Sequence, residues 1–231
     1  MDAASNFGHL VGQFADRHTV ITPDYAGSGQ TTAPAGELTL DLLLDQVAAA
    51  TRDATTGRVD LVGFSLGAVV AASLAVRHPD LVRRLVLVAG WTHSEDPRLR
   101  LGMELWARLL EMDPELSAVQ GPLVAFSPAF LSGLGHDGLA QVVKAKPAPG
   151  TLRQIDLSLR VDIRDQLPRI TAPTLVIGCT LDYLVPVQHA RSLHQAIPHS
   201  RYAELDSGHV VFLERPGELV AIICEFLAER R

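Results

Sequence analysis

The chain has 231 residues, of which 47% are hydrophobic and 20% are charged. This length suits one α/β domain with a small insertion, and the apolar fraction is enough for a large core, which excludes an intrinsically disordered protein. The net charge of −6 disfavours nucleic acid and anionic membranes as partners, because both bind basic surfaces. The two cysteines are too few for a disulfide scaffold and lack metal-binding spacing.

The sequence shows no targeting signal. No apolar run reaches the roughly 18 residues that a membrane-spanning helix needs. The first six residues, MDAASN, lack the basic start and the apolar run of a signal peptide. We therefore expect a cytoplasmic protein without a membrane partner.

The first ninety residues alternate between helix and strand patterns. Apolar side chains recur at helical spacing in the predicted helices, whereas short β-branched or continuous apolar runs predict strands. The run at 84–89 has no polar alternation, as expected for a strand that is covered on both faces of a parallel sheet. The expected elements are a helix at 7–14, a strand at 18–22, a helix at 38–51, a strand at 59–63, a helix at 68–78 and a strand at 84–89.

The pattern changes between residues 91 and 166, which read as helices interrupted by six prolines, with no convincing strand. The strand pattern then resumes. Strands alternating with helices predict an α/β fold with a doubly wound, mostly parallel sheet. Residues 1–90 and 167–231 are expected to form its core and residues 91–166 a helical cap. The later elements are a strand at 174–178, a helix at 187–196, a strand at 200–205 and a helix at 217–230.

Residues 63–67, Gly-Phe-Ser-Leu-Gly, match the pattern G-x-S-x-G between an apolar strand and an apolar helix. In such a turn the serine backbone is strained, and the glycines relieve crowding that side chains would cause. The turn raises the Ser65 hydroxyl above the sheet. It also places the backbone N–H of Leu66 at a helix N-terminus, where a developing oxyanion is stabilised. We predict that Ser65 is a nucleophile.

A serine nucleophile needs a base, and the base needs an acid that orients it. His209 lies in the loop after the last predicted strand, at the same carboxyl edge of the sheet as Ser65. Asp182 follows the strand at 174–178 and reaches the same edge. Asp206 is the nearest rival as the acid, but it lies three residues from His209 and would have to fold back. We predict a triad of Ser65, His209 and Asp182.

Four motifs resemble the α/β-hydrolase fold superfamily and cover nearly the whole chain. Within it, the sequence looks most like aminoacrylate hydrolases of pyrimidine breakdown, enol-lactonases and cofactor-free haloperoxidases or esterases. The order serine, aspartate, histidine is the order of that superfamily. The four motifs are the strand-4 signature at 21–29, the nucleophile turn at 63–67, the acid-bearing stretch at 173–186 and the histidine stretch at 207–216.

The sequence departs from this resemblance at its beginning. Members of the superfamily start with three strands, and the third ends in a glycine-rich loop that supplies one of two oxyanion donors. Here that strand would lie between the strands at 18–22 and 59–63, but the sequence starts beyond it. Loss of one such donor typically costs about 10²–10³ in rate. We expect that the start is mis-assigned or the chain is an excerpt; the alternative is a complete chain whose sheet is rearranged or completed by a partner.

The residues and the resemblance together predict a serine hydrolase acting on a small ester, lactone, thioester or amide-like carbonyl compound through an acyl-enzyme. No metal or cofactor is implied. The expected substrate-pocket residues are Phe64, Trp91, Leu105 and Trp106, although core packing explains each of them equally well. Two alternatives stay open: a non-hydrolytic reaction at the same site, such as cyclisation, elimination or decarboxylation, and a ligand-binding protein with weakened catalysis. Neither the substrate nor the oligomeric state can be inferred from the sequence.

Overall fold

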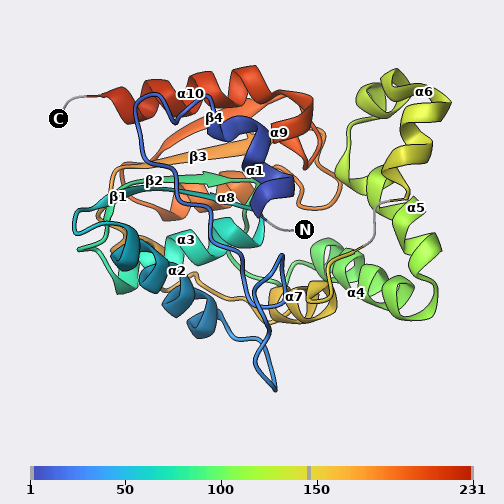
Figure 1. The fold of residues 1–231 in the computed structure, drawn as a ribbon, viewed down its shortest axis with the longest axis horizontal. Helices are drawn as coiled ribbons and strands as arrows, with labels where there is room; N and C mark the ends of the chain where they lie inside the picture. Colours follow the sequence, from blue (N-terminus) through green and yellow to red (C-terminus); the bar gives the residue numbers. More distant parts are fainter. Residues whose placement is uncertain (1–2, 145–146, 230–231) are drawn as a thin grey trace.

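A computed structural model describes residues 3–144 and 147–229, and in them four parallel strands form one sheet (Figure 1). The strands lie in the order β1-β2-β3-β4, which is also their order in the chain. In the parallel register, Leu61 of β1 is opposite Leu85 of β2, and Val86 of β2 is opposite Leu175 of β3. The fold is therefore α/β with a parallel sheet, as predicted. The strands are β1 (Val59–Phe64), β2 (Val82–Val88), β3 (Thr174–Cys179) and β4 (Arg201–Leu205).

Helices cover both faces of the sheet, and alternate residues of β2 point into two different cores. Leu85 and Leu87 pack in one core with helices α2 (Leu40–Ala54), α3 (Leu66–Arg77) and α8 (Gln188–Ala196). Val86 and Val88 pack in the other core with α1 (Ala3–Val11), α9 (Val211–Glu214) and α10 (Pro216–Ala228). Figure 1 shows α10 on one side of the sheet and α2 and α3 on the other. A central strand that is buried on both faces must be continuously apolar, which explains the pattern of β2.

The connecting helices, α4–α7, lie between β2 and β3 in the sequence. Three of the six prolines in this stretch begin a helix: Pro97, Pro114 and Pro128 stand at the first positions of α4, α5 and α6. Proline is favoured there because the first helical residues need no N–H partner within the helix. Figure 1 shows α5 and α6 lying to one side of the sheet. The bounds are α4 (Pro97–Met112), α5 (Pro114–Ala125), α6 (Pro128–Val142), α7 (Thr151–Ser158) and a 3₁₀ turn at Leu167–Arg169.

The predicted strand at 18–22 is wrong. Residues 19–25 have no regular secondary structure, and Val20 is 37% exposed. A β-branched run becomes a strand only where a neighbouring strand completes its ladder of hydrogen bonds. In the described residues β1 pairs only with β2 and stands at the edge of the sheet, so the segment has no ladder to join.

The boundaries of the other predicted elements differ from the structure by a few residues, most at the two ends of the chain. The first helix begins at Ala3 and ends at Val11, and turns follow it to residue 17. The last helix ends at Ala228, and the Arg230 end of the predicted helix lies outside the described residues. In the part of the chain that the structure describes, no helix combines the length and the apolar character needed to cross a bilayer.

Candidate active site

Ser65 stands in the sharp turn between β1 and α3 with φ 55° and ψ −123°. A non-glycine residue in this region carries about 1–3 kcal/mol of backbone strain, which the surrounding structure must hold in place. Its backbone N–H donates to the Val88 carbonyl at 2.9 Å, so the turn is tied to the neighbouring strand β2. As the first residue of α3, Leu66 presents a backbone N–H that has no partner within the helix.

The structure brings Ser65, His209 and Asp182 into one chain of hydrogen bonds. His209 Nε2 lies 2.9 Å from Ser65 Oγ, and His209 Nδ1 lies 2.6 Å from Asp182 Oδ2. Because a carboxylate only accepts, Nδ1 donates to Asp182 and Nε2 is left to accept the Ser65 hydroxyl. The arrangement can therefore take a proton from the serine and stabilise the imidazolium that results.

Three parallel strands position these side chains. Ser65 follows β1, Asp182 follows β3 and His209 follows β4, so all three stand at the carboxyl edge of the sheet. The other oxygen of the Asp182 carboxylate, Oδ1, accepts from the backbone N–H groups of Leu184 at 2.9 Å and Val185 at 2.7 Å. These bonds fix the carboxylate plane toward the imidazole. Asp182 and His209 are each only 5% exposed, which keeps water from competing for their contact.

Of the four residues expected in a substrate pocket, Phe64 touches the triad. Its ring lies against the His209 ring with centroids 4.8 Å apart, and it meets Phe212 edge-on at 5.0 Å. Trp91 is 1% exposed and packs within the core, while Trp106 is partly buried against the same core. Leu105 is 46% exposed on α4. The places of Trp91, Leu105 and Trp106 in a substrate pocket stay predictions.

The rival acid Asp206 and the buried His189 make contacts outside the triad. The Asp206 carboxylate accepts from the Thr180 hydroxyl at 2.8 Å and is exposed. His189 is 4% exposed at the start of α8, and its Nε2 lies 3.8 Å from Asp96 Oδ1, beyond hydrogen-bond distance. Burial lowers the pKa of His189 below its ordinary value. Sequence reasoning placed His189 on a helix but gave no sign of its burial.

Two further groups beside the triad were not expected from the sequence. The Tyr25 hydroxyl lies 3.5 Å from where a Cβ on Gly67 would stand, and burial raises the pKa of this phenol above its usual range. The Glu214 carboxylate is buried and accepts from the backbone N–H of Gly208, the neighbour of His209, at 3.2 Å. Both residues lie within the recognised motifs, but spacing alone does not reveal these contacts.

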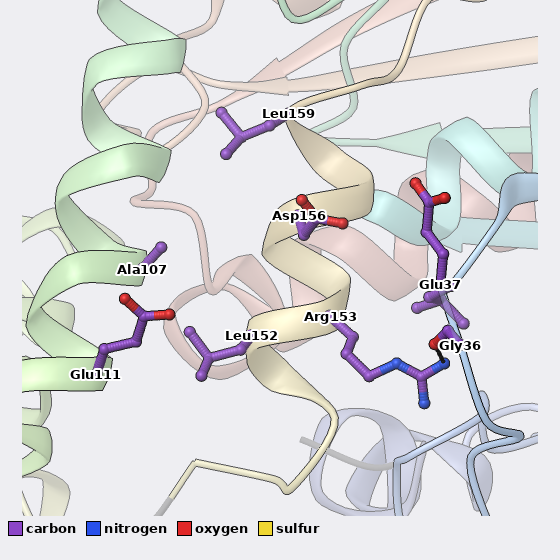
Figure 2. A pocket seen from close by; sticks show the side chains of 9 residues that line it. Gly36, Glu37, Ala107, Glu111, Leu152, Arg153, Asp156 and Leu159 are labelled. Carbon is purple, nitrogen blue, oxygen red and sulfur yellow. Dashed lines mark hydrogen bonds between the residues drawn. The ribbon is translucent and has the colours of Figure 1, made fainter.

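A cavity of about 450 Å³ lies between α4, α7 and the loop before α2 (Figure 2). Figure 2 shows Ala107 and Glu111 on one helix and Leu152 and Leu159 extending toward it from the other. No triad residue lines it, so it is separate from the Ser65 site. Within residues 3–144 and 147–229, no three side chains of His, Cys, Asp or Glu gather in a way that could hold a metal ion.

Comparison with known proteins identifies the family to which the chain belongs. Residues 3–216 match the family model described as the alpha/beta hydrolase fold. This match spans most of the chain and includes Ser65, Asp182 and His209. The chain belongs to the α/β-hydrolase family, as the sequence motifs predicted.

A curated relative and two solved structures are the most informative matches. The pyrrolizixenacetamide deacetylase of Xenorhabdus hominickii is 37% identical over 230 residues, which cover 98% of this chain and 86% of that protein. The α/β-hydrolase enzyme MGS-M2, from a Medee basin deep-sea metagenome library, superposes with a TM-score of 0.89 at 20% identity. The match covers 100% of this chain and 86% of MGS-M2. The enol-lactonase of Burkholderia xenovorans LB400 superposes with a TM-score of 0.86 at 24% identity, and the match covers 99% of this chain and 87% of the lactonase. Both structures support the fold.

Proposed function

We propose that this protein is a serine hydrolase that cleaves a small carbonyl compound through a Ser65–His209–Asp182 triad. The observation that carries the proposal is the unbroken hydrogen-bond chain from the Ser65 hydroxyl through both nitrogens of His209 to Asp182. The strained turn at Ser65 supports it, because strain of this kind is kept where a hydroxyl must be presented to a substrate.

The reaction proceeds in two steps. In the first, His209 Nε2 takes the Ser65 proton while Oγ forms a bond to the substrate carbonyl carbon, and Asp182 stabilises the imidazolium. The tetrahedral intermediate then collapses, the bond from carbon to the leaving oxygen, sulfur or nitrogen breaks, and His209 gives its proton to that leaving group. In the second step His209 takes a proton from water, the hydroxide adds to the acyl carbon, and the bond to Ser65 Oγ breaks as the proton returns to the serine.

The Leu66 N–H stabilises the negative charge on the substrate oxygen. It belongs to the first residue of α3, so the charge also meets the positive end of the helix dipole. A donor that points at the developing oxyanion typically contributes about 10²–10³ in rate. Phe64 forms an apolar wall beside the imidazole, and the connecting helices, within residues 91–166, act as the cap over the site.

The similarity to a deacetylase suggests which bond is cleaved. That relative is 37% identical, and its name describes removal of an acetyl group from an acetamide. We therefore place amide-like and ester carbonyls that carry a short acyl group first among the substrates. The same triad serves either class, since only the atom that receives the proton from His209 differs.

Labelling with a fluorophosphonate probe tests the nucleophile. The probe phosphonylates an activated serine with loss of fluoride, so the wild type should be labelled and Ser65→Ala should not. Ser73→Ala is the matched control: Ser73 lies buried on α3, and its hydroxyl has no hydrogen-bond partner among the described residues. It should label like the wild type. Absence of labelling in folded wild type, or equal labelling of Ser65→Ala, contradicts the assignment.

A substrate panel tests the reaction type. p-Nitrophenyl acetate, an aryl acetamide and a γ-lactone should be hydrolysed in a Ser65-dependent way, with the acetyl compounds fastest. Incorporation of one oxygen from labelled water into the released acid would show hydrolysis. Turnover that depends on Ser65 but consumes no water would instead support cyclisation, elimination or decarboxylation.

A further inference from the structure

Glu214 is a buried carboxylate held by hydrogen bonds from neutral groups. It forms no ion pair with Lys, Arg or His in the described residues, yet it is only 9% exposed. Three hydrogen bonds satisfy it instead. Oε1 accepts from the backbone N–H of Ser127 at 2.8 Å and of Gly208 at 3.2 Å, and Oε2 accepts from the Ser127 hydroxyl at 2.5 Å. An ionised group in such surroundings costs several kcal/mol unless its contacts compensate, so these three donors hold the carboxylate firmly.

The three donors come from two distant parts of the chain. Gly208 directly precedes His209 in the loop after β4, whereas Ser127 is the N-cap of α6, at the corner between α5 and α6. A fourth bond joins the same parts, because the Val210 N–H donates to the Ala125 carbonyl at 3.2 Å. The residues on both sides of His209 are therefore tied to this corner. Figure 1 shows α9, which ends in Glu214, on the side of the sheet toward α5 and α6.

The two backbones at this contact touch without room for a side chain. A Cβ added at Gly208 would lie 2.6 Å from the Ser127 nitrogen and 2.7 Å from the Ala125 carbonyl oxygen. Only glycine fits there, so a displacement of the corner would push directly on the residue before His209. The two nitrogens of the His209 imidazole are held by hydrogen bonds to Ser65 and Asp182. Such bonds weaken steeply when their geometry changes.

We propose that Glu214 is a positioning residue, which clamps the His209 loop to the α5–α6 corner and so makes the alignment of the imidazole depend on the position of these helices. The proposal rests on the proposed role of His209 as the base. In the described residues the hydrogen bonds of Glu214 go to Ser127 and Gly208 and none goes to Ser65 or the His209 ring, so Glu214 acts through the Gly208 backbone. Misplacement of a reacting group by about 1 Å costs about 10²-fold in rate, which sets the size of the expected effect.

Steady-state hydrolysis of p-nitrophenyl acetate by Glu214→Ala and Glu214→Gln tests the clamp. Glu214→Ala removes every contact and should lower kcat about 10- to 100-fold, while KM changes less than about threefold. Glu214→Gln keeps the shape: its Oε1 can accept both N–H groups and its Nε2 can donate to the Ser127 hydroxyl. It should recover kcat to within about fivefold of the wild type, which a role based on charge would not allow.

Ser127→Ala is a second test in case Glu214→Ala does not fold. It removes the hydrogen bond from the Ser127 hydroxyl to Glu214 and leaves the bond from Gly208 in place. It should lower kcat by a smaller factor than Glu214→Ala. Glu218→Ala, at a carboxylate that is 64% exposed on α10, is the control and should keep the wild-type kcat. Unchanged kcat in folded Glu214→Ala and Ser127→Ala, or an equal loss in the Ala and Gln variants, overturns the clamp. A wild type without Ser65-dependent turnover would overturn the proposed function instead, so the two failures are distinguishable.

Discussion

The buried polar side chains Asp182, Glu214 and His189 differ in how many hydrogen bonds they make. Asp182 accepts two backbone N–H groups and one imidazole nitrogen, and Glu214 accepts three donors. His189 Nε2, by contrast, has no hydrogen-bond partner among the described residues, although the Asp96 carboxylate lies 3.8 Å away. The first two are held rigidly, whereas His189 is a buried base that would need a proton to form an ion pair.

His189 should make stability depend on pH. Desolvation lowers its pKa below 6.5, and it outweighs the opposing fields of Asp96 and Asp182; His93 and Arg98 lower the pKa further. The folded protein therefore keeps this imidazole neutral at a pH where the unfolded chain binds a proton. The contribution of the neutral, buried His189 to the free energy of unfolding is fully present above about pH 6.5. The free energy of unfolding falls as the pH drops through that value.

Urea unfolding between pH 7.5 and pH 5 measures this effect. His189→Leu removes the titrating group, so its free energy of unfolding should fall less over this range than that of the wild type. His136→Leu, at an exposed histidine on α6, is the control and should keep the wild-type slope. If the free energy of unfolding changes equally with pH in the wild type and His189→Leu, His189 is not the source of the pH dependence.

At the scale of elements, the two glycines of the turn between β1 and α3 have different tasks. A Cβ on Gly63 would lie 2.2 Å from the Gly67 carbonyl oxygen and 2.8 Å from the Ala68 Cα, so backbone would collide with backbone. A Cβ on Gly67 would meet only the Tyr25 hydroxyl, at an ordinary contact distance of 3.5 Å. The sequence pattern suggested that both glycines relieve crowding, but only Gly63 does so.

Gly63→Ala and Gly67→Ala should therefore behave differently. Gly63→Ala forces the turn apart and should lower the free energy of unfolding by about 1–3 kcal/mol, with loss of labelling at Ser65. Gly67→Ala places alanine inside the first turn of α3 and should be neutral or stabilising, by up to about 1 kcal/mol, because alanine favours the helix. Thermal denaturation and the fluorophosphonate assay compare them. Equal destabilisation by the two changes would show that the close approach at Gly63 is not what shapes the turn.

At the scale of the whole molecule, burial is unequal between the sheet and helices α5 and α6. Residues 174–179 of β3 are all buried, and β2 is buried at every position except Arg83. Helix α6 has no buried residue along its 15 positions, and α5 has only Ser117 and Pro122. Local opening costs least where few apolar contacts must be broken. Helices α5 and α6 therefore open more easily than the sheet.

Amide hydrogen exchange should show this division. Backbone amides of β2 and β3 should exchange only through global unfolding, whereas those of α6 beyond Phe130 should exchange at least about 100-fold faster, because their opening exposes little apolar area. The Ser127 amide should be an exception within this region, since it donates to the buried Glu214. Uniform protection across β2, β3 and α6 would contradict the division.

The sequence predicted most of the elements because their signals are local. Continuous apolar runs at β2 and β3 and the G-x-S-x-G turn depend on neighbours within a few residues, and the structure has them where they were expected. The strand at 18–22 failed for the opposite reason: its β-branched composition is local, but pairing requires a second strand beside it. Trp91 shows the same limit, because nothing local distinguishes a core aromatic residue from one that lines a pocket.

What the sequence by itself determined is the family, the alternation of strands and helices, and three residues at the carboxyl ends of strands. Those follow from periodicity and from motifs that stay intact along the chain. Only the tertiary structure decided that Ser65, His209 and Asp182 join in one hydrogen-bond chain, that Phe64 covers the imidazole, and that Glu214 ties the His209 loop to α6. The physical reason is range: hydrogen bonds and ring contacts depend on ångström distances between segments up to 144 residues apart, which packing fixes and spacing does not encode.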